Sequence, residues 1–477
     1  MAFNSLSYAI FLVVAFILSW GLARFRMLRL TMLLLASWFF YMNAKAVYIL
    51  LILGSTLVDY TCGIQIAEAK SKARKKLFLT LSLVTNLGLL GTFKYYDFFL
   101  DSIRTVLVSM GWFDESATFP FLRAALPVGI SFYTFQTMAY SIDIFRGDQK
   151  PIRNFVKFAL FVSFFPQLVA GPIVLASHLI PQFERPPQLT RRQLSEGIFL
   201  TIKGLIKKVA IADFLGINLV DRIYARTGDF TSAEVLLGLF AYSMQIYCDF
   251  SGYTDLARGS GKFFGYELPI NFQRPYQAES VAKFWRRWHM TLSLWVRHYI
   301  YFPLGGTRKG DTRAYINIMV VLIVMGLWHG ANWTFFWYGV FHGFVVCVNR
   351  YHNQRRVRLK LAYDLTGWNL IWRVAFAFLF VSVARVLFRG QNLDEAWRVF
   401  IALFGPDWGL DHIHWKIWLV LAVSFAVHWS PKRWVDQAGQ VFVAAPWPLQ
   451  GIALGIMTWW MVYLSNTQPV PFIYFAF

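Results

Sequence analysis

The chain has 477 residues, of which 57% are hydrophobic and 15% charged, and its formal net charge is +21. Soluble domains have roughly 45–50% apolar and about 25% charged residues, so this composition excludes a soluble protein. A nucleic-acid partner is disfavoured too, because the basic residues gather in short connections between apolar segments, as in membrane proteins.

The apolar residues form blocks of the length that crosses a bilayer as a helix, roughly 17–25 residues. In chain order, these blocks include residues 7–23, 46–67, 77–90, 156–173, 370–388, 415–429 and 448–464. We therefore expect an all-α integral membrane protein with about ten to twelve transmembrane or re-entrant helices. One domain is expected to cover residues 1–477.

The basic residues predict an orientation, because positive charge in short loops marks the cytoplasmic side. Residues 1–7 carry no charge, whereas 24–29 and 70–76 are rich in Arg and Lys. The N-terminus is therefore expected on the extracytoplasmic side. The first apolar block lacks a basic start and is expected to be a retained helix, not a cleaved signal peptide.

Several polar or reactive residues have a structural interpretation. We expect Cys62, Cys248 and Cys347 to be packing residues and His428 to be a packed or interfacial histidine. His412 and His414 are expected on a solvated loop; their alternate spacing leaves a metal site as a weaker alternative, and no metal is predicted. Residues 390–405 are expected to form an amphipathic interfacial helix that Asn392 caps.

The segment of residues 245–306 has too many polar groups for a lipid-facing helix. Asp249 and Asp255 stand in an apolar run, where carboxylates usually face a wet cavity or a charged partner. Residues 284–301 alternate Arg and His with Trp and Tyr, which predicts a helix at the cytoplasmic interface. Its arginines, Arg286 and Arg287 among them, either bind lipid phosphate or hold a phosphorylated donor.

The segment "GLWHGANW" (residues 326–333) places His329 between an apolar and an aromatic run. In an apolar surround the imidazole is expected to be neutral, and a neutral imidazole is a good general base. Asn332 would lie about one helical turn away on the same face. The alternative is a histidine that only bonds a neighbouring helix.

Two stretches carry a resemblance: "GLWHGANWTFFWYGVFHG" and "NFQRPYQAESVAKFWRRWHMTLSLWVRHYIYFPLGG". Together they resemble the membrane-bound O-acyltransferase family, and most of all its bacterial branch of alginate O-acetylation and teichoic-acid D-alanylation proteins. The core signature covers about residues 125–350. The resemblance implies a fold with cytoplasmic and extracytoplasmic funnels in a bacterial cytoplasmic (inner) membrane.

The resemblance also implies roles for individual residues. The defining family histidine maps onto His329, the base that deprotonates a hydroxyl beside a thioester, and a second maps onto His289. Contacts to the donor or its carbonyl are expected from the following residues: Asn271, Arg274, Arg286, Arg287, Trp328 and Asn332. No bound cofactor is expected; acetyl-CoA is the expected donor, with an acyl-carrier protein as the alternative.

The C-terminal sequence "PFIYFAF" (residues 471–477) is either an aromatic anchor or an acyl relay. It is similar to the C-terminal motif of the small partner protein in D-alanylation, which implies Tyr474 as a covalent acyl carrier. The expected partner is an extracytoplasmic esterase-like (SGNH or serine) acetyltransferase that collects the acyl group.

The expected function is O-acetylation of an exported polysaccharide across the membrane, in contact with membrane lipids. Three alternatives remain: D-alanyl transfer from a carrier protein to teichoic acid, acylation of a lipid, and a transporter or flippase without chemistry.

Overall fold

The computed structural model describes residues 3–169, 171–361, 365–467, 472 and 473, and within these ranges every regular element is a helix. The chain divides into two compact units. Unit 1 comprises Phe11–Gln188 and Tyr266–Leu268, and unit 2 comprises Ala2–Ile10, Leu189–Gly265 and Pro269–Phe477. The prediction of one domain over the whole chain stays a prediction.

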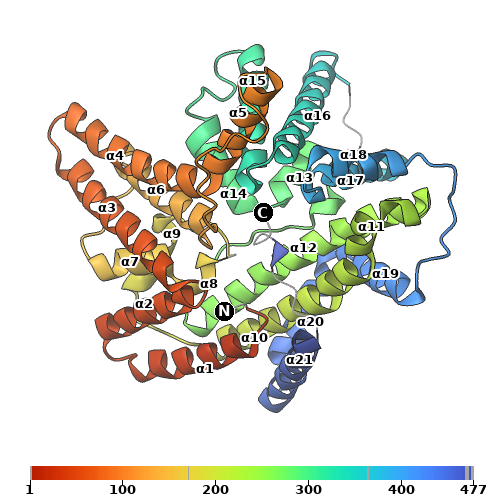
Figure 1. Ribbon diagram of the computed structural model, residues 1–477. Helices are drawn as coiled ribbons and strands as arrows, with labels where there is room; N and C mark the ends of the chain where they lie inside the picture. Colours follow the sequence, from red (N-terminus) through yellow and green to blue (C-terminus); the bar gives the residue numbers. More distant parts are fainter. Residues whose placement is uncertain (1–2, 170, 362–364, 468–471, 474–477) are drawn as a thin grey trace. The chain divides into compact units, whose positions relative to one another are not determined.

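Unit 1 is built on a bundle in which α3, α4 and α6 pack against one another (Figure 1). Its elements are α1 (Leu6–Gly21, which begins in unit 2), α2 (Arg26–Met42), η1 (Ala46–Tyr48), α3 (Ile49–Glu68), α4 (Lys72–Leu90), η2 (Gly91–Tyr95), α5 (Tyr96–Ser109), α6 (Ile130–Arg146), α7 (Phe155–Ser163), α8 (Phe165–Leu168) and α9 (Ala176–Glu184). The apolar block predicted at 156–173 is broken at Phe164, whose non-helical backbone (φ −53°, ψ 111°) separates α7 from α8.

Unit 2 holds the other elements: α10 (Arg191–Leu205), η3 (Ile206–Asp213), η4 (Gly216–Val220), α11 (Asp221–Ala225), η5 (Thr227–Asp229), α12 (Ser232–Phe263), η6 (Pro275–Gln277), α13 (Val281–Arg287), α14 (Met290–Val296), η7 (Arg297–Tyr301), α15 (Asp311–His329), α16 (Trp333–Arg358), α17 (Gly367–Arg389), α18 (Leu393–Ala402), α19 (Trp415–Trp429), α20 (Lys432–Ala444) and α21 (Trp447–Thr467). Asn392 caps α18 by accepting the Glu395 N–H at 2.8 Å, as predicted.

Among the described helices, four stretches are long and apolar enough to cross a membrane: Ala46–Glu68, Lys72–Ser109, Asp311–His329 and Gly367–Arg389. The pair Lys432–Ala444 and Trp447–Met461, bent by 115°, makes a fifth if it is one span. Three shorter apolar helices accompany them. Helix α12 is long enough to cross a membrane but too polar to be among them, and the expected count of ten to twelve stays a prediction.

Helices α15 and α16 form an antiparallel pair with little side-chain volume between them. A Cβ at Gly326 would collide with the Phe335 carbonyl oxygen, and one at Gly339 would lie 2.5 Å from the Leu322 carbonyl oxygen. Glycine is needed at both positions because the two backbones are in contact. The close approach sets the position of His329, the last residue of α15.

Helix α12 packs along α10 and η3 through glycines and buried ion pairs. A Cβ on Gly252 would lie 2.8 Å from the Gly204 carbonyl oxygen. Asp255 lies 3.2 Å from the Lys203 ammonium and 2.7 Å from that of Lys207, so its predicted basic partner is confirmed. Buried carboxylates need such partners, because an unpaired charge away from water is costly.

The helix predicted over residues 284–301 is broken. Helix α13 ends at Arg287 and α14 begins at Met290, and between them His289 adopts a left-handed backbone with φ 41° and ψ 57°. The break follows from pairing with a second segment: the Gln273 N–H donates to the Arg287 carbonyl and the Met290 N–H to the Asn271 carbonyl, both at 2.9 Å.

Candidate active site

The two histidines predicted to act together contact the same indole. The Trp328 ring centroid lies 4.9 Å from that of His329 and 5.5 Å from that of His289. All three side chains are buried, with 4% or less of their surface exposed. His289 comes from the break between α13 and α14 and His329 from the end of α15, so tertiary packing brings them together.

Asn271 fixes which nitrogen of His289 carries the proton. The Asn271 Oδ1 accepts the Thr291 backbone N–H at 3.2 Å and the Thr291 hydroxyl at 2.9 Å. A backbone N–H only donates, so this atom is the amide oxygen. His289 Nδ1, 3.1 Å from the same oxygen, must therefore donate its proton. The lone pair of the ring is left on Nε2, the nitrogen that can act as a base.

Burial sets the charge of His289, which lies outside the helices long enough to cross a membrane. Removal from water lowers the pKa of its imidazole to about 3, so the ring is neutral at physiological pH. The left-handed backbone adds a second constraint, because a residue other than glycine rarely adopts a positive φ and such residues cluster at functional sites. His289 therefore has a neutral ring, one fixed tautomer and a fixed backbone.

His329 ends α15 beside the ring of Phe388, whose centroid is 5.0 Å away. The backbone becomes extended at Gly330, with φ −162°. The sequence predicted Asn332 one turn further along the same helix as His329. This prediction is wrong, because the helix ends at His329. Asn332 is the N-cap of α16, where its side chain accepts the Thr334 N–H at 3.0 Å and donates to the Gln391 carbonyl at 2.7 Å.

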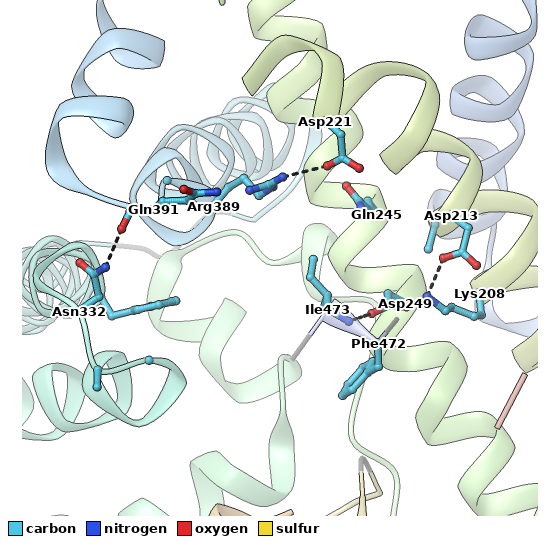
Figure 2. A pocket seen from close by; sticks show the side chains of 15 residues that line it. Lys208, Asp213, Asp221, Gln245, Asp249, Asn332, Arg389, Gln391, Phe472 and Ile473 are labelled. Atoms are coloured by element: carbon cyan, nitrogen blue, oxygen red, sulfur yellow. Dashed lines mark hydrogen bonds and ion pairs between the residues drawn. The ribbon is translucent and has the colours of Figure 1, made fainter. Parts of the chain in front are cut away.

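A cavity of about 550 Å³ begins directly after His329. Figure 2 shows the polar side chains that surround it, drawn from helices far apart in the sequence. The lining residues are Lys208, Ala212, Asp213, Asp221, Gln245, Asp249, Gly330, Ala331, Asn332, Phe335, Arg389, Gly390, Gln391, Phe472 and Ile473. This volume lies within the range of small-molecule sites, about 300–1,000 Å³.

Charged groups in the wall of the cavity are paired. Arg389 lies 2.9 Å from Asp221, and the buried Lys208 ammonium lies 2.6 Å from Asp213 and 2.7 Å from Asp249. Lys208 is buried between these two carboxylates, so it does not belong to an exposed basic surface.

The end of the described chain enters the same cavity. Phe472 is fully buried, with its ring centroid 4.3 Å from that of Tyr253 and 5.6 Å from that of Phe250. Phe250 in turn contacts His289 at 4.8 Å. Ile473 lines the cavity and donates its backbone N–H to Asp249 at 2.8 Å. Tyr474, the predicted acyl carrier, lies outside the described residues.

The other predicted donor-binding residues take different positions. Arg274 is half-buried and donates to the His428 carbonyl at 3.4 Å. Arg286 is exposed on α13 and Arg287 is half-buried. None of these three arginines lines the cavity, so any donor they hold would approach from elsewhere on unit 2.

Two buried groups near the site were not singled out from the sequence. His342 on α16 accepts the Trp285 indole N–H at 3.2 Å through Nδ1. Arg385 on α17 donates to the Tyr276 hydroxyl at 2.6 Å and lies 4.8 Å from the centroid of the Trp288 ring. Both stand in apolar runs, as His329 does, and that signal alone could have marked them.

Two further histidines, His428 and His412, have structural contacts. The prediction of a packed His428 is confirmed, because the ring is buried and its Nε2 accepts the Tyr276 N–H at 3.3 Å. His412 is exposed but not only solvated: its Nδ1 lies 3.1 Å from the fully buried carboxylate of Glu234 at the start of α12.

The family model of membrane-bound O-acyltransferases matches residues 148–388. The chain belongs to this family. It is 40% identical to a probable alginate O-acetylase of Azotobacter vinelandii over 82% of this chain and 75% of that protein. It is 37% identical to a peptidoglycan O-acetyltransferase of Helicobacter pylori over 78% of this chain and 73% of that one. A teichoic acid D-alanyltransferase of Streptococcus thermophilus shares 26% over 57% and 69%.

Family membership and the apolar helices establish an integral membrane O-acyltransferase with an all-helical fold. The predicted family, fold class and enzyme class are thereby confirmed. The matched region contains His289, His329 and Asn271. It also contains the cavity-lining residues from Lys208 to Phe335.

Proposed function

We propose that this acyltransferase moves an acetyl group from cytoplasmic acetyl-CoA to a hydroxyl of an exported polysaccharide. The observation that carries the proposal is a single arrangement: two buried histidines share Trp328 beside a cavity, and Phe472 and Ile473, the residues before Tyr474 in the sequence, line the same cavity. The relatives named as O-acetylases or O-acetyltransferases support acetyl as the group and a glycan as the acceptor.

In the first step, His329 takes the proton of the Tyr474 hydroxyl while the phenolate oxygen attacks the thioester carbonyl. The carbon–sulfur bond breaks, and the coenzyme A thiolate leaves and recovers the proton from His329. The products are acetyl-tyrosine and coenzyme A. A phenol with a pKa of about 10 leaves more readily than an alkyl alcohol, so the ester remains reactive. The covalent relay divides one transfer into two accessible steps.

His289 is assigned to orient the donor or share the proton, with Nε2 as its basic nitrogen. Asn271 would act through His289 by holding the tautomer. Trp328 excludes water between the two rings, which protects the thioester from hydrolysis. Asn332 would face the acceptor from the cavity wall, while Arg274, Arg286 and Arg287 remain candidates for the phosphates of coenzyme A.

The charges at the ends of α15 and α16 support an orientation in the bilayer. Arg350 and Arg358 lie 3.0 and 3.3 Å from Asp311, so the start of α15 and the end of α16 meet among basic residues. We assign this end to the cytoplasm by the positive-inside rule. His329 and the cavity lie at the opposite ends of these helices, toward the extracytoplasmic side, where an esterase-like partner would collect the acetyl group.

D-Alanyl transfer to teichoic acid is the alternative. The relative named for that activity is 26% identical, against 40% for the O-acetylase. The carrier-like C-terminal sequence, which D-alanylation places on a separate small protein, is part of this chain. Both observations favour acetyl transfer.

The test is release of coenzyme A by the purified protein, followed with a thiol reagent. Wild-type protein should release it from acetyl-CoA. General-base catalysis supplies about 10²–10⁴-fold, so His329→Ala should lower the rate by at least about 10²-fold. His352→Ala, an exposed histidine on α16, serves as the control. If His329→Ala releases coenzyme A at the wild-type rate, the assignment of His329 as the base is refuted.

A further inference from the structure

A second cavity of about 550 Å³ in unit 2 adjoins the cavity beside His329. Asp221 lines both cavities and lies 2.9 Å from Arg389, a pair that Figure 2 shows among the residues around the first one. The charged and aromatic residues that line the second cavity are Asp221, Arg222, Arg226, Asp229, Phe230 and His412. A ligand in the second cavity would therefore lie next to the candidate active site.

Two arginines of the second cavity have no counter-charge among the described residues. The Arg226 N–H donates to the Arg222 carbonyl at 3.0 Å, so the two residues stand one helical turn apart. Both side chains are exposed, and in the described part of the chain neither guanidinium makes a hydrogen bond or ion pair. Like charges at this spacing repel each other, whereas a carboxylate between two guanidinium groups forms charge-assisted, forked hydrogen bonds. The pair therefore favours an anionic ligand.

The side of the membrane strengthens this point. The second cavity adjoins the one that we assign to the extracytoplasmic side, and short connections on that side are normally poor in Arg and Lys. Arg222 and Arg226 nevertheless stand close together in the short segment between η4 and α12. An anion that arrives from outside the cell accounts for both.

The rings in the cavity wall add the features of a sugar site. The Phe230 and His412 rings lie 6.3 Å apart at an angle of 76°. The fully buried Glu234 holds His412 in place, because its carboxylate lies 3.1 Å from Nδ1 and accepts the His412 backbone N–H at 2.8 Å. Asp229 lines the same wall and can accept hydrogen bonds from hydroxyl groups. Aromatic surface with a few fixed polar groups is typical of small-molecule sites, and a cavity of this volume fits one.

We propose that the second cavity is a subsite for one sugar unit of the acceptor glycan, a sugar that carries a carboxylate. Arg222 and Arg226 bind the carboxylate, and Asp229 accepts from the hydroxyl groups. Phe230 and His412 contact the apolar face of the sugar ring. A lipid phosphate would supply the anion but would leave these two rings without a partner. This inference rests on the proposed transfer to a polysaccharide.

The test is binding of a fluorescently labelled trigalacturonate to the detergent-solubilised full-length protein, measured by anisotropy. Hydrogen bonds to charged groups are the strong ones, so Arg222→Ala combined with Arg226→Ala should weaken binding at least about tenfold. Lysine keeps the charge but not the fork, so Arg222→Lys with Arg226→Lys should fall in between. Arg398→Ala, at an exposed arginine of α18 outside the cavity, should bind as the wild type does. Equal affinity of the wild type and the double alanine variant would overturn the subsite.

Two competitors identify the class of ligand. Maltotriose has the same number of sugar units without a carboxylate, and it should displace the probe only at a concentration at least about tenfold higher than unlabelled trigalacturonate. Glycerol 3-phosphate supplies an anion without a sugar ring and should also compete poorly. If maltotriose competes equally well, the sugar does not need a carboxylate and the proposal is wrong. Equal competition by glycerol 3-phosphate would show a phosphate or headgroup site and refute the sugar assignment.

Binding does not require turnover, so the subsite and the proposed function can fail separately. Arginine-dependent binding of the probe to a protein that releases no coenzyme A from acetyl-CoA would support the subsite and refute acetyl transfer. A protein that releases coenzyme A through His329, but binds the probe no better than its double alanine variant, would refute the subsite and leave the proposed function standing.

Discussion

His289 shows how neighbouring groups fix the tautomer and the orientation of one side chain. Asn271 accepts from three donors, one of them the His289 ring. That bond places the lone pair on Nε2, and the pairing of the two backbone segments fixes the ring against Trp328 and Phe250. The neighbours therefore determine the protonation and orientation of His289 as well as its position.

Without Asn271, the His289 ring should lose both its fixed tautomer and its fixed orientation. Partners that orient metal-bound histidines typically contribute about 10–100-fold, and we expect Asn271→Ala to lower the rate of coenzyme A release by a factor of this order. Single-turnover kinetics of the purified variant measure it, with Asn218→Ala on η4 as the control. Equal rates in the two variants would contradict the assignment.

Acid should destabilise the protein through His289. Its pKa is about 3 in the folded state and about 6.5 when unfolded, so the unfolded chain binds a proton that the folded one does not. The stability contributed is present above about pH 6.5 and falls by about 1.4 kcal/mol per unit below it. Between pH 6.5 and 5, we expect a loss of about 2 kcal/mol, measured by denaturant unfolding. His289→Gln should lose that much less over the same interval; an identical acid response would contradict the prediction.

The backbone contact between α15 and α16 determines the position of His329. Gly326→Ala would push a methyl group against the Phe335 carbonyl. Overpacking of this kind costs about 1–3 kcal/mol, so we expect a lower melting temperature and reduced coenzyme A release. Gly54→Ala on α3, where a Cβ would meet no atom within 4 Å, should leave both unchanged. If the two variants have the same melting temperature, the backbones of α15 and α16 are not in contact at Gly326.

Elements were predicted well where periodicity and length decide them. The apolar blocks at 46–67, 370–388 and 415–429 match α3 with η1, α17 and α19 closely. The sequence did not predict the helix break at His289 or the role of Asn332 as the N-cap of α16. Both depend on hydrogen bonds between distant segments, which no local pattern encodes. The same limit hid the pairing of Lys208 with Asp213 and Asp249, which are 5 and 41 residues away in the chain.

For the whole molecule, the orientation in the membrane is open to direct test. With Cys62, Cys248 and Cys347 replaced, a membrane-impermeant maleimide added to intact cells should label Asp411→Cys in the loop before α19. It should label Arg356→Cys, near the basic end of α16, only after the cells are opened. Labelling of Arg356→Cys in intact cells would reverse the proposed direction of transfer.

The path of the acyl group can be followed directly by the intact mass of the protein. Wild-type protein, His329→Ala and Tyr474→Phe would each be incubated with acetyl-CoA and weighed by mass spectrometry. We expect an acetyl adduct on the wild type that both substitutions abolish. An adduct that survives in Tyr474→Phe would place the carrier elsewhere and contradict it.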